Sequence, residues 1–351
     1  MTGDRHASFG RTLAAMQGHQ QGHHGWNAFH RALLDLTASS DPALDRILAV
    51  VRHKRPSMSD SHLITLLGIA VRQLASTHPD MASVFEPGAL PAERSRSLGA
   101  ALERHETEAV DLLTSHSNSF TGARRFLVPQ LLIGGFARHF GVDEVRLLDV
   151  GTGLGALPRQ LNNREVFDRF AADLTWLPER PPYLDIPLAV RHGIDAAPLP
   201  TTDWVGSCHG PSAYYEDRWS ELVWSLERAA ATAGQVRLSA LDVLDRAQLA
   251  GFLRTHRFNV ITCNFVLYQY EREVRERLIA ELVGQLAAPG LFLSMEPSHD
   301  LVRQGSRVTG YLAGDPRPLH LADAEDAHFI GRVTAGADLA AVIGSGTGGG
   351  S

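Results

Sequence analysis

The chain has 351 residues, of which 44% are hydrophobic and 21% charged, and its formal net charge is −6. These values are typical of folded globular proteins, so we expect one large domain or two ordinary ones rather than disorder. The acidic balance, without a long basic block, argues against a nucleic-acid backbone or an anionic membrane as the main partner. Cys208 and Cys263 form no CxxC pair, no hydrophobic signal core follows the first residues, and no apolar stretch reaches membrane-spanning length. The composition therefore predicts a soluble, cytoplasmic protein without a disulfide framework.

Residues 1–140 carry the pattern of a helical domain. In "DPALDRILAVVRH", Asp41 is suited to cap a helix and Pro42 to occupy its first turn. "SDSHLITLLGIAVRQLAS" is apolar on nearly all sides, which predicts a helix buried on more than one face. "SLGAALERHETEAVDLLTSH" continues the helical period, after a proline-punctuated segment, "PGALPAERSR", that is expected to be a loop. We expect residues 1–140 to form a lid or substrate domain without strands.

The pattern changes at Val145, where short apolar runs begin to alternate with helical segments. The strand candidates are "VRLLDV", "GQVRLSALDV", "FNVITCNFVL" and the end of "PGLFLSMEP", with an amphipathic helix in "EREVRERLIAELVGQLAA". This alternation predicts an α/β fold over residues 141–340: a Rossmann-like, doubly wound, mostly parallel sheet with helices on both faces. Residues 162–235 give no clear pattern, and the Gly- and Ser-rich end of 341–351 predicts a flexible tail.

The segment "LLDVGTGLGAL" follows the first strand candidate with three closely spaced glycines. Gly151 and Gly153 allow the backbone to approach a ligand closely. With Ala156 they satisfy the GxGxxG/A pattern of dinucleotide sites; with Asp149 and Gly155 they satisfy the (D/E)xGxGxG pattern of enzymes that bind S-adenosylmethionine (SAM). A purely structural tight turn is the third interpretation of the same glycines.

Two further acids and a later strand favour SAM. Asp195 lies in "RHGIDAAPLP", a GxDxxP pattern that resembles the second motif of SAM enzymes, whose acid accepts hydrogen bonds from both ribose hydroxyls. Asp242 ends a strand, at a position that resembles the one where SAM enzymes place an acid against the adenine amino group. The stretch from "FNVITCNFVL" to "PGLFLSMEP" matches the fourth strand, helix and turn that follow. Asp173 is the alternative ribose ligand, since it lies nearer the conventional distance after the glycine loop. We prefer Asp195 and take residues 162–188 as an insertion.

With these motifs the chain resembles class I SAM-dependent methyltransferases. Over roughly residues 30–335 it is also similar to a little-characterised family, known mainly as a domain of unknown function, that has a helical N-terminal region and a stretch like "RHGIDAAPL…SC…RWSELVWSLERA". It departs from that family in "SNSFTGARR", where a Gln-Thr-Asn-Glu-like segment is usual. The resemblance implies SAM as cofactor, and it implies the following binding residues: Asp149, Gly151, Thr152, Gly153, Gly155, Asp195, Asp242, Val243, Asn264 and Phe265.

Methyl transfer from a sulfonium is an in-line displacement, so positioning and desolvation supply most of the acceleration, and a base is needed only if the acceptor must lose a proton. The candidate catalytic residues are Tyr268, Tyr270, Asn118, Phe120 and Glu296. Phe120 is included because an aromatic face attracts a cation such as a sulfonium. For the aromatic candidates, packing in the core is the competing interpretation.

Four functions remain open at this point. The first is a SAM-dependent methyltransferase acting on a small molecule. The second is a SAM-consuming cyclase or lyase that releases methylthioadenosine, for example while forming azetidine-2-carboxylate. The third is a non-catalytic SAM-binding interaction module. The fourth, a nicotinamide oxidoreductase, lacks counterparts for Asp242 and "PGLFLSMEP".

Histidines cluster in "GHQQGHHGWNAFH", and the spacing of four between His19 and His23 would suit a metal on a helix face. The neighbouring glycines and glutamines favour a mobile segment instead, and no carboxylate or cysteine joins His24 and His30 there. We therefore expect no metal site.

Overall fold

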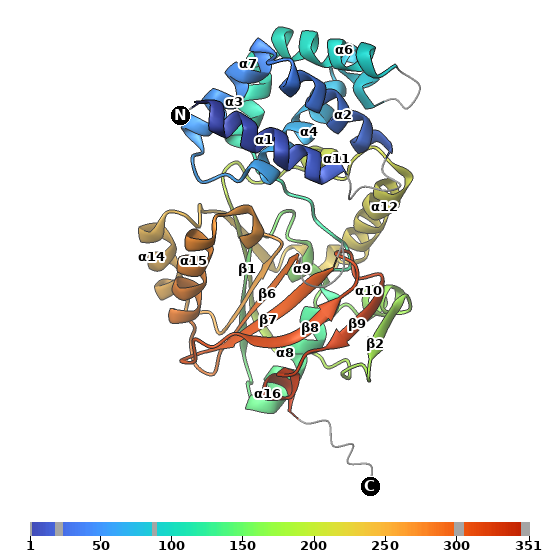
Figure 1. Ribbon diagram of the computed structural model, residues 1–351. Helices are drawn as coiled ribbons and strands as arrows, with labels where there is room; N and C mark the ends of the chain where they lie inside the picture. Colours follow the sequence, from blue (N-terminus) through green and yellow to red (C-terminus); the bar gives the residue numbers. More distant parts are fainter. Residues whose placement is uncertain (1, 18–23, 86–89, 298–304, 345–351) are drawn as a thin grey trace. The chain divides into compact units, whose positions relative to one another are not determined.

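The structure is a computed structural model, and it describes residues 2–17, 24–85, 90–297 and 305–344. The chain forms two compact units (Figure 1). The helical unit comprises residues 1–120, 200–220 and 269–271; the α/β unit comprises residues 121–199, 221–268 and 272–351. Each unit is described by itself below.

The helical unit is built from eight helical elements near the start of the chain and from a later segment. They are α1 (Thr2–Gln17), α2 (His24–Ala38), α3 (Pro42–Lys54), α4 (Asp60–Ala75), α5 (Pro79–Ala82), η1 (Ser83–Phe85), α6 (Pro91–Arg104), α7 (Glu106–Ser115) and α11 (Thr202–Cys208). Helix α12 (Ala213–Arg228) begins in this unit and continues into the other.

The capping and burial predicted for the helical unit are confirmed. The Asp41 carboxylate accepts hydrogen bonds from the backbone N–H groups of Ala43 and Leu44 at the start of α3, as an N-cap does. Helix α4 buries most of its residues, including Leu67 and Val71, and contacts α1, α5, α7 and α11. Because it is surrounded, α4 is the centre of this unit's core.

Two local predictions in this unit are wrong. Pro91 opens α6, so much of the expected loop "PGALPAERSR" is helix, since proline is well suited to the first helical turn. The helix expected across "SLGAALERHETEAVDLLTSH" is broken at His105, whose φ and ψ of −109° and 25° separate α6 from α7.

The α/β unit contains a nine-stranded sheet and the helices that cover it. Its strands are β1 (Val145–Val150), β2 (Leu174–Leu177), β3 (Leu188–Asp195), β4 (Val236–Ala240), β5 (Val260–Asn264), β6 (Leu291–Pro297), β7 (Ser306–Leu312), β8 (Leu319–Ala324) and β9 (Gly331–Ala335). Its helices are α8 (Leu127–Phe140), α9 (Ala156–Gln160), α10 (Arg164–Ala171), α13 (Ala230–Ala233), α14 (Arg246–His256), α15 (Arg272–Gly284) and α16 (Leu339–Ile343), and η2 (Leu267–Gln269) begins in this unit.

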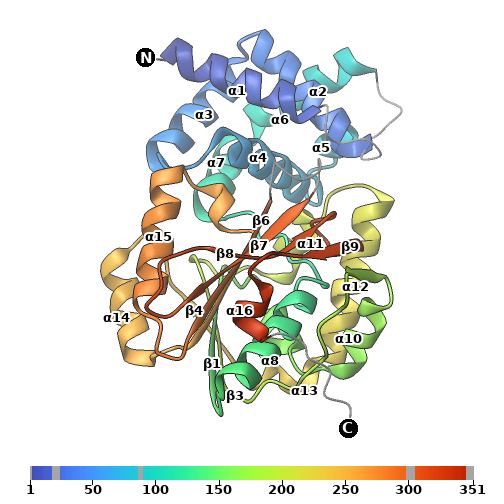
Figure 2. The ribbon, with the colours of Figure 1, turned by 60° about the horizontal axis from the view of Figure 1, so that its bottom comes forward.

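The strand order is β2-β9-β8-β7-β6-β5-β1-β3-β4. The neighbours from β4 through β3, β1 and β5 to β6 are all parallel, and so are β2 and β9. Figure 2 shows α14 and α15 along one side of this sheet and α8, α10 and α16 along the other. After β1 the chain forms β2 at the far edge of the sheet. It then forms β3 and β4 on one side of β1 and β5 on the other, so the strand order switches next to β1. The predicted Rossmann-like, doubly wound, mostly parallel α/β fold with a helical N-terminal region is confirmed.

The sheet extends further than the sequence pattern indicated. After β6 the chain forms an antiparallel meander of β7, β8 and β9, where continued alternation of strands and helices was expected. The segment taken as an insertion contains α10 and β2, and β2 pairs with β9 at the edge of the sheet farthest from β4.

The predicted division at residue 140, and a lid role for residues 1–140, stay predictions. In the structure α8 belongs to the α/β unit, while residues 200–220 belong to the helical unit. The tail predicted at 341–351 overlaps α16 over its first three residues, and 345–351 lie outside the described residues. Within the described ranges, none of the helices combines the length and the apolar character that crossing a membrane requires.

Candidate active site

The glycine loop follows β1 at the point where the strand order switches. Gly151, Gly153 and Gly155 have φ values of 68°, 56° and 70°, in the left-handed region that favours glycine. A Cβ on Gly151 would also lie 2.2 Å from Cγ2 of Val266. Thr152 is buried next to β3, where it occupies space that Gly193 leaves, since a Cβ on Gly193 would lie 2.5 Å from the Thr152 hydroxyl oxygen. The loop is therefore a tight structure that other residues cannot adopt cheaply.

Most of the loop's backbone N–H groups bind within the protein. Those of Gly151 and Thr152 both donate to the carbonyl oxygen of Ile194, and that of Gly155 donates to the carbonyl oxygen of Thr152. The N–H of Gly153 donates to Oδ2 of Asp195 at 2.8 Å. Donors that are used in this way are not directed at a phosphate, in contrast to a nucleotide-binding loop.

Asp149, on β1, is a buried carboxylate. Its Oδ1 accepts a hydrogen bond from the hydroxyl of Thr262 at 2.7 Å, and the two residues are paired in register between β1 and β5. Burial raises the pKa of Asp149 to about 6, against the opposing effect of the Thr262 hydrogen bond. Thr262 was not among the predicted site residues, although a polar residue in an otherwise apolar strand is the signal that could have indicated it.

Asp195 ends β3, which is the strand next to β1. Its Oδ2 accepts from the Gly153 N–H and its Oδ1 from the Ala196 N–H, both at 2.8 Å. An ionised carboxylate has about four lone-pair positions, so each oxygen keeps one for a further donor. The residue is partly buried, and burial raises the pKa of its carboxyl group, although the two backbone hydrogen bonds oppose that rise. Asp195 can therefore hold the glycine loop and accept two hydroxyl groups at the same time.

Asp173, the alternative ribose ligand, lies elsewhere. It immediately precedes β2, and five strands separate β2 from β1 in the sheet. Its carboxylate forms an ion pair with Arg124 at 2.8 Å, and its side chain is 57% exposed. The structure thus places Asp195, and not Asp173, beside the glycine loop.

Asp242 follows β4, the next strand beyond β3, and is exposed. Its Oδ1 accepts a hydrogen bond from the Leu244 N–H at 2.9 Å, which leaves lone pairs of the carboxylate toward solvent. Val243 beside it is buried, and the backbone N–H of Leu241 donates to the carbonyl oxygen of Asp195. Asp149 in β1, Asp195 at the end of β3 and Asp242 just after β4 therefore lie at or near the carboxyl ends of three adjacent strands.

Asn264 and Phe265 end β5, on the other side of β1. Oδ1 of Asn264 is buried and has no hydrogen-bond partner among the described residues, although its chemistry requires one. Phe265 has a φ of 57°, an unfavourable conformation for a bulky residue, and the guanidinium carbon of Arg125 lies 3.8 Å from the centre of its ring. Strained backbone conformations cluster at functional sites, and a buried polar group without a partner is often satisfied by a water molecule or a ligand.

Glu296 lies near the end of β6 and organises the segment after β5. Its Oε1 accepts hydrogen bonds from the N–H groups of Val266 and Leu267 at 3.1 and 3.0 Å, and its Oε2 accepts from that of Tyr268 at 3.1 Å. Burial raises the pKa of Glu296 to about 7, although these three hydrogen bonds oppose that rise. In this structure Glu296 positions the backbone next to the glycine loop.

The remaining catalytic candidates are divided between the units. Tyr268 belongs to the α/β unit, while Tyr270 belongs to the helical unit and forms an isolated antiparallel bridge with Met58. Asn118 accepts a hydrogen bond from the Phe120 N–H at 3.0 Å, again within the helical unit.

Phe120 packs inside the helical unit, against His209 with 4.2 Å between ring centroids and edge-on to Tyr215 at 5.9 Å.

His19 and His23 of the N-terminal histidine cluster lie outside the described residues. His30 is buried, and burial lowers its pKa to about 4.

Comparison with known proteins gives structural neighbours of low similarity. No protein-family model matches the chain, and a search among curated proteins finds no match. Among solved structures, the chain is similar to PKMT2 from Rickettsia typhi in complex with AdoHcy, with 18% identity over 48% of this chain and 25% of that one, and a TM-score of 0.27.

It is also similar to SAM-bound CalS10, an amino pentose methyltransferase from Micromonospora echinaspora, with 17% identity over 53% of this chain and 63% of that one (TM-score 0.27). A third is the rRNA methyltransferase aviRa from Streptomyces viridochromogenes, with 14% identity, 49% and 75% coverage, and a TM-score of 0.29. The chain thus covers less than two thirds of the length of the first two neighbours. The fold assignment rests on the strand order itself, and the resemblance to the little-characterised family stays a prediction.

Proposed function

We propose that the α/β unit binds SAM and that the protein is a SAM-dependent methyltransferase for a small molecule. One observation carries the proposal: groups that could bind a ligand lie in a row at the carboxyl ends of neighbouring parallel strands. They are Asn264 at the end of β5, the glycine loop after β1, Asp195 at the end of β3 and Asp242 after β4. In an open α/β sheet, ligands bind at the carboxyl ends of the strands beside the switch in strand order.

The chemistry of these groups fits SAM. Asp195 keeps lone pairs for two ribose hydroxyls, Asp242 offers an exposed carboxylate for an amino group, and the buried Oδ1 of Asn264 needs a donor. Asp149 and Glu296 add two buried carboxyl groups, whose pKa values burial raises to about 6 and about 7, so neither is a full negative charge near pH 7. The acceptors of Asp195, Asp242 and Asn264 suit the hydroxyl and amino groups of a nucleoside better than they suit phosphates.

A dinucleotide fits less well. A pyrophosphate needs N–H donors from the glycine loop and from the start of the following helix, yet four loop N–H groups bind Ile194, Thr152 and Asp195. The following helix, α9, has only five residues. The nicotinamide oxidoreductase is therefore the weaker proposal.

In this proposal, Asp149, Thr152 and the three glycines shape the loop, and Val243 and Phe265 are the apolar neighbours of the adenine and of the methionine chain. When bound, SAM supplies an electrophilic methyl group. Glu296 acts as a positioning residue, since all three of its hydrogen bonds go to backbone of the α/β unit. Tyr268, Tyr270, Asn118 and Phe120 stay candidates for contacts with the reacting groups.

Binding is tested by calorimetry with SAM, S-adenosylhomocysteine, NADH and NADPH. We expect the first two to bind and to raise the melting temperature, because a ligand of the native state stabilises it by mass action. Binding of NADH without binding of SAM would reverse the choice of cofactor.

The reaction is tested by incubation with SAM alone, with all products identified by mass spectrometry. A methyltransferase without its acceptor leaves SAM intact, and with a set of small-molecule acceptors it forms S-adenosylhomocysteine. Methylthioadenosine formed well above the spontaneous rate would instead identify a SAM cyclase or lyase. SAM binding without any product in either experiment would favour the non-catalytic binding module.

A further inference from the structure

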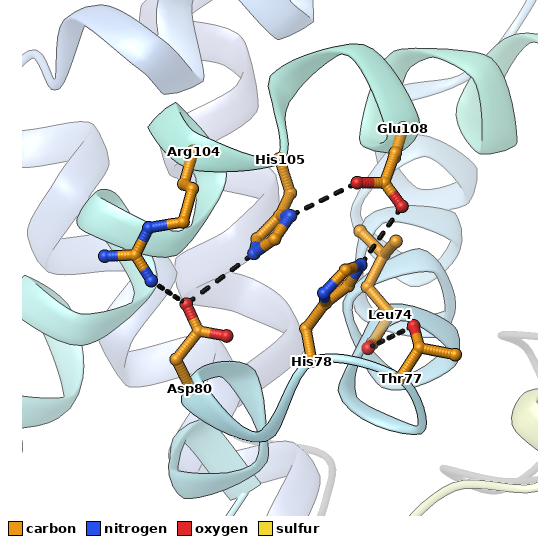
Figure 3. Close-up of polar contacts among 7 residues, drawn as sticks. All are labelled: Leu74, Thr77, His78, Asp80, Arg104, His105 and Glu108. Carbon is orange, nitrogen blue, oxygen red and sulfur yellow. Dashed lines mark hydrogen bonds and ion pairs between the residues drawn. The ribbon is translucent and has the colours of Figure 1, made fainter.

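Two histidines and a glutamate meet in the helical unit, far along the chain from the glycine loop (Figure 3). His78 lies just before α5, His105 separates α6 from α7, and Glu108 lies in the first turn of α7. Nε2 of His78 is 3.1 Å from Oε2 of Glu108, and Nδ1 of His105 is 3.2 Å from Oε1 of the same carboxylate. The three side chains offer ligand atoms that all lie within 4.8 Å of one another. From this geometry we propose that His78, His105 and Glu108 bind a divalent transition-metal ion, with Zn²⁺ as the best fit.

The spacing of the atoms suits such an ion. Zinc binds imidazole nitrogen and carboxylate oxygen at about 2.0–2.2 Å, so neighbouring ligand atoms of a tetrahedral site are about 3.3–3.5 Å apart. The two nitrogen–oxygen distances, 3.1 and 3.2 Å, are close to that separation. Two histidines and one carboxylate are a ligand set that first-row transition metals accept, with positions left for water.

The two rings also pack against each other. The imidazole rings of His78 and His105 are stacked with 3.8 Å between centroids and 29° between planes. This contact holds the two histidines side by side, with one nitrogen of each next to the same Glu108 carboxylate.

A second carboxylate lies near His105. Oδ2 of Asp80 is 3.6 Å from Nε2 of His105, which is too long for a hydrogen bond, and Asp80 is also paired with Arg104 (Figure 3). Nδ1 of His105 faces Glu108, so this is the ring nitrogen that would bind a metal ion.

The site is accessible to an ion and joins separate parts of the helical unit. The side chain of Glu108 is 52% exposed and that of His78 26%, whereas that of His105 is 11% exposed. Solvent water can therefore complete the coordination. A bound ion would connect the turn before α5 with the junction of α6 and α7, so its binding would stabilise this unit against unfolding.

The test uses the full chain after removal of metals with a chelator. Titration with Zn²⁺ should give one site of low-micromolar affinity and raise the melting temperature by several degrees, and Co²⁺ should give the visible absorption of a four- or five-coordinate ion with imidazole ligands. Glu108→Gln and His105→Gln should each weaken binding at least tenfold. His53→Gln, a change at an exposed histidine of α3, is the matched control and should leave binding unchanged.

The N-terminal histidines are the competing source of metal binding, so the double variant His23→Gln/His24→Gln is measured in parallel and should bind as the unmodified chain does. Loss of binding in this double variant but not in Glu108→Gln would overturn the proposal. So would the absence of stoichiometric binding by the unmodified chain up to 100-fold excess of Zn²⁺, which would leave a hydrogen-bonded His–Glu–His cluster.

If a variant fails to fold, the unmodified chain is treated with diethyl pyrocarbonate, which modifies histidines, with and without Zn²⁺. Mass spectrometry then maps the modified residues, and Zn²⁺ should protect His78 and His105. Modification of both histidines at the same rate with and without Zn²⁺ would overturn the proposal. None of these outcomes depends on whether the α/β unit binds SAM.

Discussion

Replacing Asp195 by Asn should weaken the binding of S-adenosylhomocysteine by roughly 10- to 100-fold. The carboxylate uses one lone pair of each oxygen for the N–H groups of Gly153 and Ala196, which leaves one on each oxygen for the two ribose hydroxyls. An amide has one oxygen, so at least one hydroxyl loses a charged acceptor, and the amide NH₂ must face one of the two backbone N–H groups. A hydrogen bond to a charged group contributes about 1.5–3 kcal/mol, which corresponds to this range of affinity.

The matched control is Asp173→Asn, just before β2, the edge strand that five other strands separate from β1. Its ion pair with Arg124 involves a largely exposed carboxylate, so the change should cost at most about 1 kcal/mol of stability and leave affinity within twofold. Calorimetry with S-adenosylhomocysteine avoids turnover during the measurement.

An analogue of S-adenosylhomocysteine that lacks both ribose hydroxyls tests whether the lost affinity comes from the contact between Asp195 and the ribose. This analogue should bind the unmodified chain and Asp195→Asn with similar affinity, because the interaction that the mutation removes is already missing. Equal affinity of the two proteins for the complete ligand, or a larger loss in Asp173→Asn, would refute this placement of the ribose.

Three further predictions concern the framework of the site. Gly151→Ala should destabilise the protein by roughly 2–4 kcal/mol in urea unfolding, because alanine would have to adopt a positive φ and its Cβ would clash with Val266. The control Gly251→Ala lies on α14, where a Cβ meets nothing within 4 Å, and should stabilise the protein by about 0.5–1 kcal/mol. The pKa of Glu296 is about 7 in the folded protein against 4.5 in the unfolded chain, so its contribution to stability is present below about pH 4.5 and is lost as pH rises to about 7, by about 3 kcal/mol. Glu296→Gln should flatten that part of the stability–pH profile, measured by urea unfolding at pH 5 and 7.5, and an unchanged slope would exclude Glu296 as its source. Phe265→Gly should relieve the positive φ but remove a buried ring and its contact with Arg125, so a lower melting temperature and a lower SAM affinity are both expected, and unchanged stability would contradict it.

The parallel part of the sheet could be predicted because its signals are local. β1, β5 and β6 are short, mostly apolar runs whose residues are nearly all buried, which is how strands buried on both faces are recognised. β7 buries alternate residues, and β2 has four residues, so both depend on partners that sequence pattern does not reveal. The meander and the far edge of the sheet were missed for that reason.

Some residues of the candidate site could likewise be predicted from the sequence, and others could not. The glycine loop and Asp242 follow predicted strands, so their position at the carboxyl ends of the parallel strands could be expected from the fold. Asp195 was selected from its GxDxxP setting, because β3 lies within residues 162–235, where no strand was predicted. The engagement of Glu296 with three N–H groups and the strained backbone of Phe265 arise from tertiary contacts. The His105–Glu108 pair has a visible spacing of three, but His78 joins it only through the packing of α5 against α6.

The pairing of β2 with β9 has a consequence for the order in which the chain can fold during synthesis. Leu174 of β2 is paired with Gly331 of β9, so β2 leaves the ribosome roughly 150 residues before its partner exists. Until then β2 lacks its only strand neighbour in the sheet, while β1 and β3 can already pair. An unfinished chain thus exposes an unpaired strand and a short hydrophobic segment, the features that promote association between nascent chains. β9 joins β2 to the rest of the sheet, so in a chain that ends before Gly331 the strand β2 would stay unpaired.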